Sequence, residues 1–251
     1  MTWCDKLAST PTVGITFNHH FASSSSILDA IAPVLDKLVS DKKPIFTIGK
    51  QDSFGVELTT EDGFQYAINT ASISVAFVHR LKLKNQSGGY PTTEMISRPQ
   101  PFSALLPEVC RRLLQIAPLV IDAKSRQLKQ IGIVTSTMVD EEESPPGILR
   151  FIKNVTKPWQ GKLDAYSFQI VSRLSQDASG SDRCIHEIVR PEEDNDGLAT
   201  LKFDWQRRFN SETLSPTGTR LTELLILAQK DATKYFEELA EGNRFDVDTN
   251  G

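Results

Sequence analysis

Histidine is the first residue type to consider, because its side chain titrates near neutral pH and is the commonest metal ligand. The chain has four histidines, and His19 and His79 fall in the apolar register of segments that alternate like strands. His79 lies among Val75, Phe77 and Leu81. The two imidazoles are candidate ligand-binding residues in the pocket of a small-molecule enzyme or sensor. The simpler interpretation, which we favour, is that each is a half-buried side chain bonded to a neighbour.

A second candidate is a metal-like spacing late in the chain. Cys184 and His186 share one face of a predicted strand, and Asp182 precedes them. A structural zinc site needs four ligands, and no cysteine pair elsewhere completes this one. Cys184 acting as a nucleophile would need a histidine brought from another part of the fold. We therefore expect no metal and no catalytic residue at this position.

Other motifs of catalysis and cofactor binding do not occur in the sequence. It has no Gly-x-Ser-x-Gly elbow, no Gly-x-Gly-x-x-Gly turn and no P-loop. The acidic stretch 192–197 resembles a calcium loop, but Phe203 occupies the twelfth position, where such a loop requires a glutamate. We expect no cofactor, and an enzyme is the less favoured class of function.

A stretch at the end of a predicted strand interleaves aromatic and basic residues. Trp205, Arg207 and Arg208 are candidate nucleic-acid-binding residues, because aromatic rings beside arginines can hold a single strand. The favoured alternative is that Trp205 faces the core with Phe203, while Lys202 and Arg207 point outward.

Composition and charge restrict the class of protein. The 251 residues, of which 39% are apolar, suffice for one large or two small domains. The net charge of -4 argues against a general affinity for nucleic acid or for an anionic membrane. No apolar run approaches the roughly 20 residues that cross a bilayer, and no secretory signal is visible. Because Cys4, Cys110 and Cys184 are widely spaced, we expect reduced thiols and a cytoplasmic protein.

The most decisive stretch is 215–242, which predicts one long amphipathic helix. Ser215 and Pro216 are a plausible cap and first turn, and Gly242 is a plausible stop. The helix must lie on an apolar surface formed by the strands before it. Its apolar stripe consists of Leu221, Leu224, Leu225, Ala228, Ala232, Tyr235, Phe236 and Leu239.

The rest of the chain alternates between short strands and amphipathic helices. Asp62-Gly63 predicts a tight hairpin within an antiparallel meander. The stretch 86–101 predicts a surface loop. Strands are expected over 12–21, 45–48, 54–59, 64–69, 73–83, 127–139, 163–174, 183–189 and 198–205, and further helices over 27–38 (kinked at Pro33), 103–117 and 147–155.

This order of elements occurs twice, which suggests a duplicated unit of strand, helix, meander and helix. The openings of the halves 1–118 and 119–251 also match, with Val13-Gly14-Ile15 aligned to Ile131-Gly132-Ile133. We predict an α+β fold in which antiparallel sheets carry helices on one face and join edge to edge. Both halves would pack as one globular unit, and a groove between sheet and long helix would be the natural place for a ligand.

In layout the chain resembles a family of uncharacterised, sporadically distributed prokaryotic proteins of similar length. The resemblance rests on 130–133 (Gln-Ile-Gly-Ile), on 224–232 (Leu-Leu-Ile-Leu-Ala-Gln-Lys-Asp-Ala) and on 235–238 (Tyr-Phe-Glu-Glu). It implies the same α+β plan and no established activity.

The function that these observations favour is that of a non-enzymatic binding or assembly protein. It would use the sheet-helix groove or a sheet edge, with a protein partner or a second copy of the chain as ligand. A small ligand remains open. The alternatives are the pocket involving His19 and His79, and single-stranded nucleic-acid binding through Trp205, Arg207 and Arg208.

Overall fold

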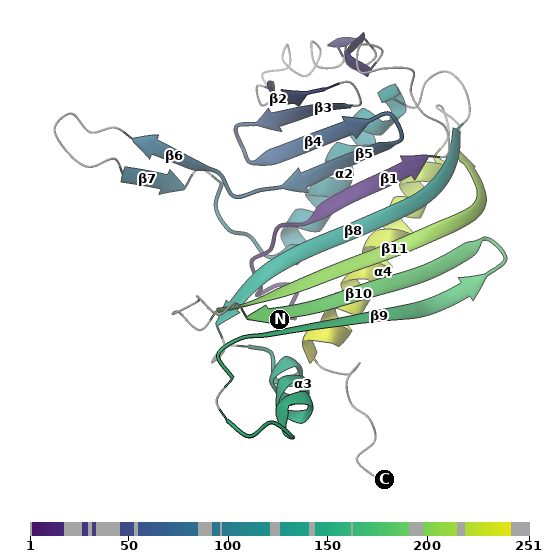
Figure 1. Ribbon diagram of the computed structural model, residues 1–251. Helices are drawn as coiled ribbons and strands as arrows, with labels where there is room; N and C mark the ends of the chain where they lie inside the picture. The colour runs from purple at the N-terminus through teal and green to yellow at the C-terminus, as the bar shows by residue number, and fades with distance from the viewer. Residues whose placement is uncertain are drawn as a thin grey trace.

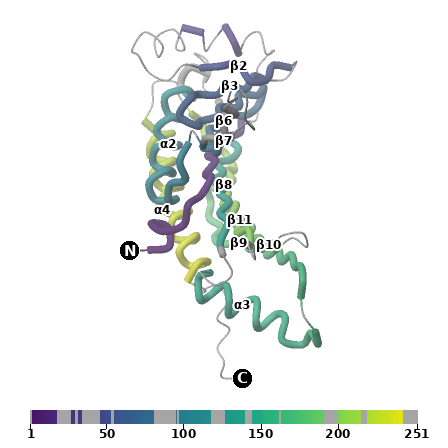
Figure 2. The backbone as a smooth tube through the Cα atoms, turned by 90° about the vertical axis from the view of Figure 1, so that its left-hand side faces the viewer, coloured from purple at the N-terminus to yellow at the C-terminus, as the bar shows by residue number. Residues whose placement is uncertain are grey.

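One nine-stranded antiparallel sheet organises the chain (Figure 1). Its strand order is β2-β3-β4-β5-β1-β8-β11-β10-β9, and a separate two-stranded sheet pairs β6 with β7. Turned on its side, the sheet carries α2 and α4 on the same face (Figure 2). The computed structural model describes residues 2–17, 27–29, 32–33, 46–52, 55–84, 92–95, 97–120, 126–140, 144–161, 163–190, 198–214 and 219–241.

The α+β class is confirmed, and most expected elements occur close to their predicted positions. Within the predicted helix 27–38, residues 27–29 and 32–33 are helical, and the rest lies outside the described residues. The strands are β1 (Thr12–Phe17), β2 (Phe46–Gln51), β3 (Gly55–Thr60), β4 (Phe64–Asn69), β5 (Ser72–Phe77), β6 (Leu81–Lys84), β7 (Thr92–Met95), β8 (Arg126–Asp140), β9 (Tyr166–Asp177), β10 (Gly180–Arg190) and β11 (Leu198–Leu214), and the helices are α2 (Phe102–Val120), α3 (Pro146–Thr156) and α4 (Arg220–Glu241).

The opening strands of the two halves meet at the centre of the sheet. β1 runs antiparallel to β8, and Gly14 pairs with Gly132, with Val13 opposite Ile133 and Ile15 opposite Ile131. Outward from this pair, β5, β4 and β3 on one side correspond in order to β11, β10 and β9 on the other. The halves therefore join into one sheet about an approximate two-fold axis. The division into 1–118 and 119–251 as folding units stays a prediction.

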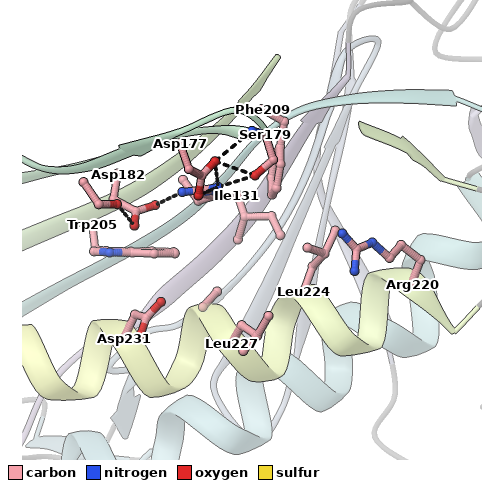
Figure 3. Close-up of a pocket in the computed structure, with 13 residues that line it drawn as sticks. Ile131, Asp177, Ser179, Asp182, Trp205, Phe209, Arg220, Leu224, Leu227 and Asp231 are labelled. Carbon is pink, nitrogen blue, oxygen red and sulfur yellow. Dashed lines mark hydrogen bonds and ion pairs between the residues drawn. The ribbon is translucent and has the colours of Figure 1, made fainter. Parts of the chain in front are cut away.

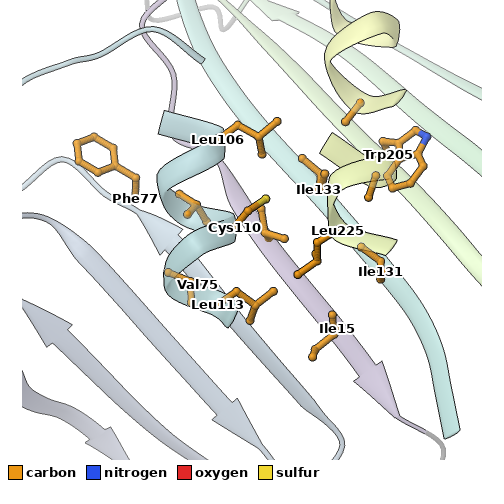
Figure 4. Close-up of a cluster of buried hydrophobic side chains, with 14 of the residues drawn as sticks. Ile15, Val75, Phe77, Leu106, Cys110, Leu113, Ile131, Ile133, Trp205 and Leu225 are labelled. Carbon is orange, nitrogen blue, oxygen red and sulfur yellow. The ribbon is translucent and has the colours of Figure 1, made fainter. Parts of the chain in front are cut away.

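The core lies between the sheet and the two long helices (Figure 4). The predicted stripe of α4 is buried at Leu221, Leu225 and Phe236. The ring of Phe236 contacts Phe102 of α2 and Phe203 of β11, with centroid distances of 4.9 and 5.8 Å. Each such side chain contributes roughly 1.5–3 kcal/mol through removal from water. The predicted cap at 215–216 and the stop at Gly242 lie outside the described residues.

A cluster of contacts around Arg112 fixes α2 to the β3–β4 hairpin. The turn occurs at Asp62-Gly63 as predicted, and Gly63 adopts a φ of 94°, which favours glycine. Arg112 of α2 donates to Asp62 at 2.5 Å and to Glu108 at 2.6 Å. Its guanidinium also lies 3.7 Å from the centroid of the Phe64 ring. The cluster therefore holds the turn against the helix.

Two predictions about the first half are wrong. The single strand expected over 73–83 is divided into β5 and β6, and β7 lies inside the expected loop 86–101. Just beyond the last β4–β5 pair, Phe64 with Phe77, the Val78 N–H donates to the Gly63 carbonyl oxygen at 2.8 Å. The Ser97 hydroxyl then donates to the Val78 carbonyl oxygen and accepts from the Arg80 N–H. Beyond these bonds, residues 81–84 pair with 92–95 and not with a strand of the main sheet.

Among the described residues, no helix combines the length and the apolar character needed to cross a bilayer.

Candidate functional site

Of the two histidines predicted to share a pocket, only His79 lies among the described residues. His79 follows the end of β5, where it is exposed and meets the Phe77 ring edge-on at a centroid distance of 5.8 Å. His19 lies outside the described residues. The prediction that the two imidazoles share a pocket therefore stays a prediction.

The Cys184, His186 and Asp182 side chains all point from β10 toward the helices. Cys184, His186 and Asp182 are all buried. In the part of the chain that the structure describes, no group of three or more histidine, cysteine, aspartate or glutamate side chains is arranged to hold a metal ion. A different cysteine, Cys110 of α2, is protonated at neutral pH, because burial raises the pKa of its thiol to about 12.

Trp205, Arg207 and Arg208 do not share one surface. Trp205 is 1% exposed and faces the core, as the favoured interpretation predicted. The expectation that Arg207 points outward is wrong, because β11 continues to Leu214 and its alternation places Arg207 on the same face as Trp205. Arg208 lies on the opposite, exposed face. Nucleic-acid binding through all three residues together is an untested prediction.

A cavity of about 360 Å³ lies where α4 passes over the β9–β10 turn and the middle of β11 (Figure 3). The sequence predicts a groove between the sheet and the long helix, and this cavity lies between those elements. Its apolar wall consists of Ile131, Phe209, Leu224, Leu227 and Ala228, and its polar wall of Ser175, Asp177, Ser179, Asp182, Trp205, Arg207, Arg220 and Asp231.

The β9–β10 turn forms one wall and is held by Asp177. The carboxylate of Asp177 accepts from the Ser179 N–H, the Ser179 hydroxyl and the Gly180 N–H at 2.7–2.9 Å. Arg207 Nη2 donates to both Asp177 oxygens, at 2.9 and 2.8 Å. The Ser179 hydroxyl and then the Arg207 guanidinium hold the pKa of Asp177 well below its usual range.

Arg207 connects this turn to Asp182 deeper in the site. Its Nη1 donates to Asp182 Oδ1 at 3.1 Å, and the Ser175 hydroxyl donates to Asp182 Oδ2 at 2.6 Å. The Arg207 and Asp182 side chains are only 16% and 11% exposed. The Arg207 charge is therefore satisfied within the protein.

The second arginine of the wall is also paired. Arg220, at the start of α4, donates to both carboxylate oxygens of Glu212 at 3.0 and 2.9 Å. The hydrogen bond from Arg220 holds the pKa of Glu212 below its usual value. Both guanidinium groups of the wall thus have carboxylate partners.

Asp231 differs from the other acids because it has no such partner. It lies on α4, half-buried, and forms no hydrogen bond or ion pair with any described residue. Burial, and secondarily the charge of Asp182, raise the pKa of Asp231. Three carboxylates and two guanidinium groups line the cavity, so its wall carries a negative excess.

Trp205 is a second residue of the cavity wall whose polar group has no partner among the described residues. Its indole N–H is buried, and no described residue accepts a hydrogen bond from it. In Figure 3 the indole ring is seen from its edge and lies between the Asp182 and Asp231 side chains. The cavity therefore combines an aromatic ring, an unpaired carboxylate and an apolar wall, which together can recognise a cation attached to an apolar group.

Sequence reasoning missed Asp231 and the Asp177–Ser179 turn. A signal for Asp231 did exist, since it follows Leu224 and Ala228 at i+7 and i+3, beside the apolar stripe of α4. An acid at such a position faces the sheet side of the helix.

Comparisons with protein-family models, with curated proteins and with solved structures find no match to this chain.

Proposed function

We propose that the protein is a binding protein that holds a small molecule in the cavity between α4 and strands β9–β11. The ligand carries a protonated amine and an apolar portion. The observation that carries the proposal is the Asp231 carboxylate, which is half-buried, has a raised pKa and has no partner among the described residues.

The chemistry of the wall supports an amine. A carboxylate that has lost part of its hydration is stabilised by an opposite charge within about 4–6 Å. The neighbouring Trp205 ring attracts a cation through its face. Arg207 and Arg220 pair with other carboxylates. The charges of Lys230, Lys234 and Arg207 lower the pKa of Asp231, but burial and Asp182 outweigh them.

The apolar wall and the volume support a compact ligand. Leu224, Leu227 and Phe209 present carbon surface to the same cavity. Its volume of about 360 Å³ is at the lower end of the range of roughly 300–1,000 Å³ for small-molecule sites. An arylalkylamine of one ring matches this size.

Isothermal titration calorimetry with phenethylamine tests the proposal. We expect binding to the wild type and a loss of about tenfold or more in affinity for Asp231→Asn, because a hydrogen bond to a charged group contributes about 1.5–3 kcal/mol. Glu61→Gln is the matched control, since it removes one negative charge from an exposed turn far from the cavity. 2-Phenylethanol, which has the same shape without the charge, should bind more weakly than the amine. If phenethylamine does not bind the wild type, or binds the wild type and Asp231→Asn equally well, the proposal fails.

Self-association through a sheet edge is a second candidate function. β9 is the last strand of the described sheet on one side, and at Tyr166–Asp177 it is long for an edge strand. Its Val171 side chain is 52% exposed. We expect light scattering to detect a dimer that Val171→Lys dissociates, because edge lysines block strand pairing. A wild-type monomer at all concentrations would exclude this candidate.

A further inference from the structure

The sheet face opposite α2 and α4 carries a hollow of its own. The described long helices lie on one side only, as Figure 2 shows. On the other side β9, β10 and β11 surround a hollow of about 420 Å³. Arg173, Arg183 and Arg208 line it, one from each strand, together with Ser181 and Asp182.

The strand register brings the three arginines together. Arg183 of β10 pairs directly with Arg173 of β9. Arg208 of β11 pairs with Ser181, which is two residues from Arg183 on the same face of β10. Like charges directly opposite one another on neighbouring strands are destabilising. The sheet therefore holds a charge arrangement that does not serve its own stability.

These arginines also lack the partners that other arginines of the chain have. Arg173 and Arg183 form no hydrogen bond or ion pair with any described residue, and Arg208 donates only to Gln206, at 3.3 Å. Arg112, Arg207 and Arg220, by contrast, all pair with carboxylates.

The carboxylate of Asp204 lies close enough to Arg183 and Arg208 to interact with them electrostatically. Burial raises the pKa of Asp204, while a hydrogen bond from Gln206 and the charges of Arg183, Lys202 and Arg208 lower it. Asp182 also lines the hollow, but its carboxylate is paired with Arg207 and Ser175. Three guanidinium groups beside two carboxylates, one of which is already paired, leave the hollow positive. Because the chain as a whole carries a net charge of -4, this positive region is a local feature.

We infer that Arg173, Arg183 and Arg208 form a binding site for a phosphate group on the open face of the sheet. Guanidinium groups match the geometry of phosphate oxygens and bind them through paired, charge-assisted hydrogen bonds. A bound phosphate would also offset the repulsion between Arg173 and Arg183. Asp182 lines both hollows, but none of the three arginines lines the α4 cavity, so the site does not depend on the amine proposal.

The test titrates pyrophosphate and a single-stranded oligothymidylate into the protein at low salt. We expect at least one of them to bind, and Arg183→Gln to weaken that binding about tenfold or more. Arg208→Gln should weaken it as well. Arg98→Gln is the matched control, because Arg98 is exposed and lies outside the hollow. The Asp231→Asn variant should bind the phosphate probe like the wild type, which separates this site from the amine cavity.

The two probes distinguish the source of the phosphate. Tight pyrophosphate binding indicates a small phosphorylated molecule. Binding of the oligothymidylate alone, with an affinity that falls steeply as salt rises, indicates a nucleic-acid backbone. The inference is overturned if neither probe binds, or if Arg183→Gln and Arg98→Gln bind the probe equally well.

Discussion

Ala228→Leu is the substitution that examines the α4 cavity most sharply. Ala228 is buried on the face of α4 that turns toward the sheet, and it lines the cavity. One helical turn further on, Ala232 is equally buried but does not line the cavity. Ala232→Leu is therefore a matched control, in which the same three carbon atoms must enter a packed region.

The magnitude follows from the added carbon atoms. Burial of each is worth about 0.8 kcal/mol, which gives about 2.4 kcal/mol for the change from alanine to leucine. Fixing the leucine side chain costs about 0.5–1 kcal/mol. The net gain in the free energy of unfolding for A228L is about 1.5 kcal/mol, or a rise in Tm of about 3–6 °C in a chain of this size. Overpacking at Ala232 should instead cost about 1–3 kcal/mol.

Urea denaturation followed by circular dichroism measures both variants. We expect A228L to unfold at higher urea concentration than the wild type, and A232L at lower concentration. A228L should also lose phenethylamine binding, because leucine fills the space that the ligand needs. If A228L is destabilised as strongly as A232L, the space beside Ala228 is filled in solution and the reasoning is refuted.

Three further predictions concern the frame of the site. Arg207→Ala should lower the free energy of unfolding by roughly 2–4 kcal/mol in urea denaturation, because it leaves the Asp182 carboxylate without its charge partner. A loss below about 0.5 kcal/mol would mean that the pair is not buried. Gly180→Ala should destabilise the protein by about 2 kcal/mol or more, since a Cβ there would clash with the backbone carbonyl of residue 208. In the control Gly132→Ala the new Cβ would meet no atom closer than 3.7 Å, so stability should change by about 0.5 kcal/mol or less. Equal effects of the two substitutions on Tm would contradict the register of this turn. Asp231→Asn should be more stable than the wild type at neutral pH without ligand, because a carboxyl whose pKa is raised in the folded state lowers the stability of the protein as pH rises through that pKa. The difference in stability should vanish below about pH 3.8, the ordinary pKa of the group. A difference that does not depend on pH would contradict the assignment.

The elements with strong periodicity could be predicted from the sequence. The stripe of α4 is buried where the 3.6-residue period placed it, from Leu221 to Phe236. The matching Gly14 and Gly132 segments also form equivalent strands, and they pair with each other. These features depend on local alternation and on a repeated order of elements, both of which a sequence displays directly.

The polar site could not be predicted in the same way. Asp177, Asp182 and Asp231 come from β9, β10 and α4, and only the strand register and the position of the helix bring them to one cavity. The direction of Arg207 was mistaken because the strand was expected to end at Trp205. Once β11 is known to continue, alternation alone places Arg207 beside Trp205.

The most direct measurement is the pKa of the Asp231 carboxyl by carbon-13 NMR, with and without phenethylamine. We predict a pKa above the ordinary aspartate value in the free protein, owing to burial and to Asp182, and a fall when the amine binds, since an opposite charge favours the ionised form. An ordinary pKa in the free protein, or a pKa that saturating phenethylamine leaves unchanged, would contradict the account.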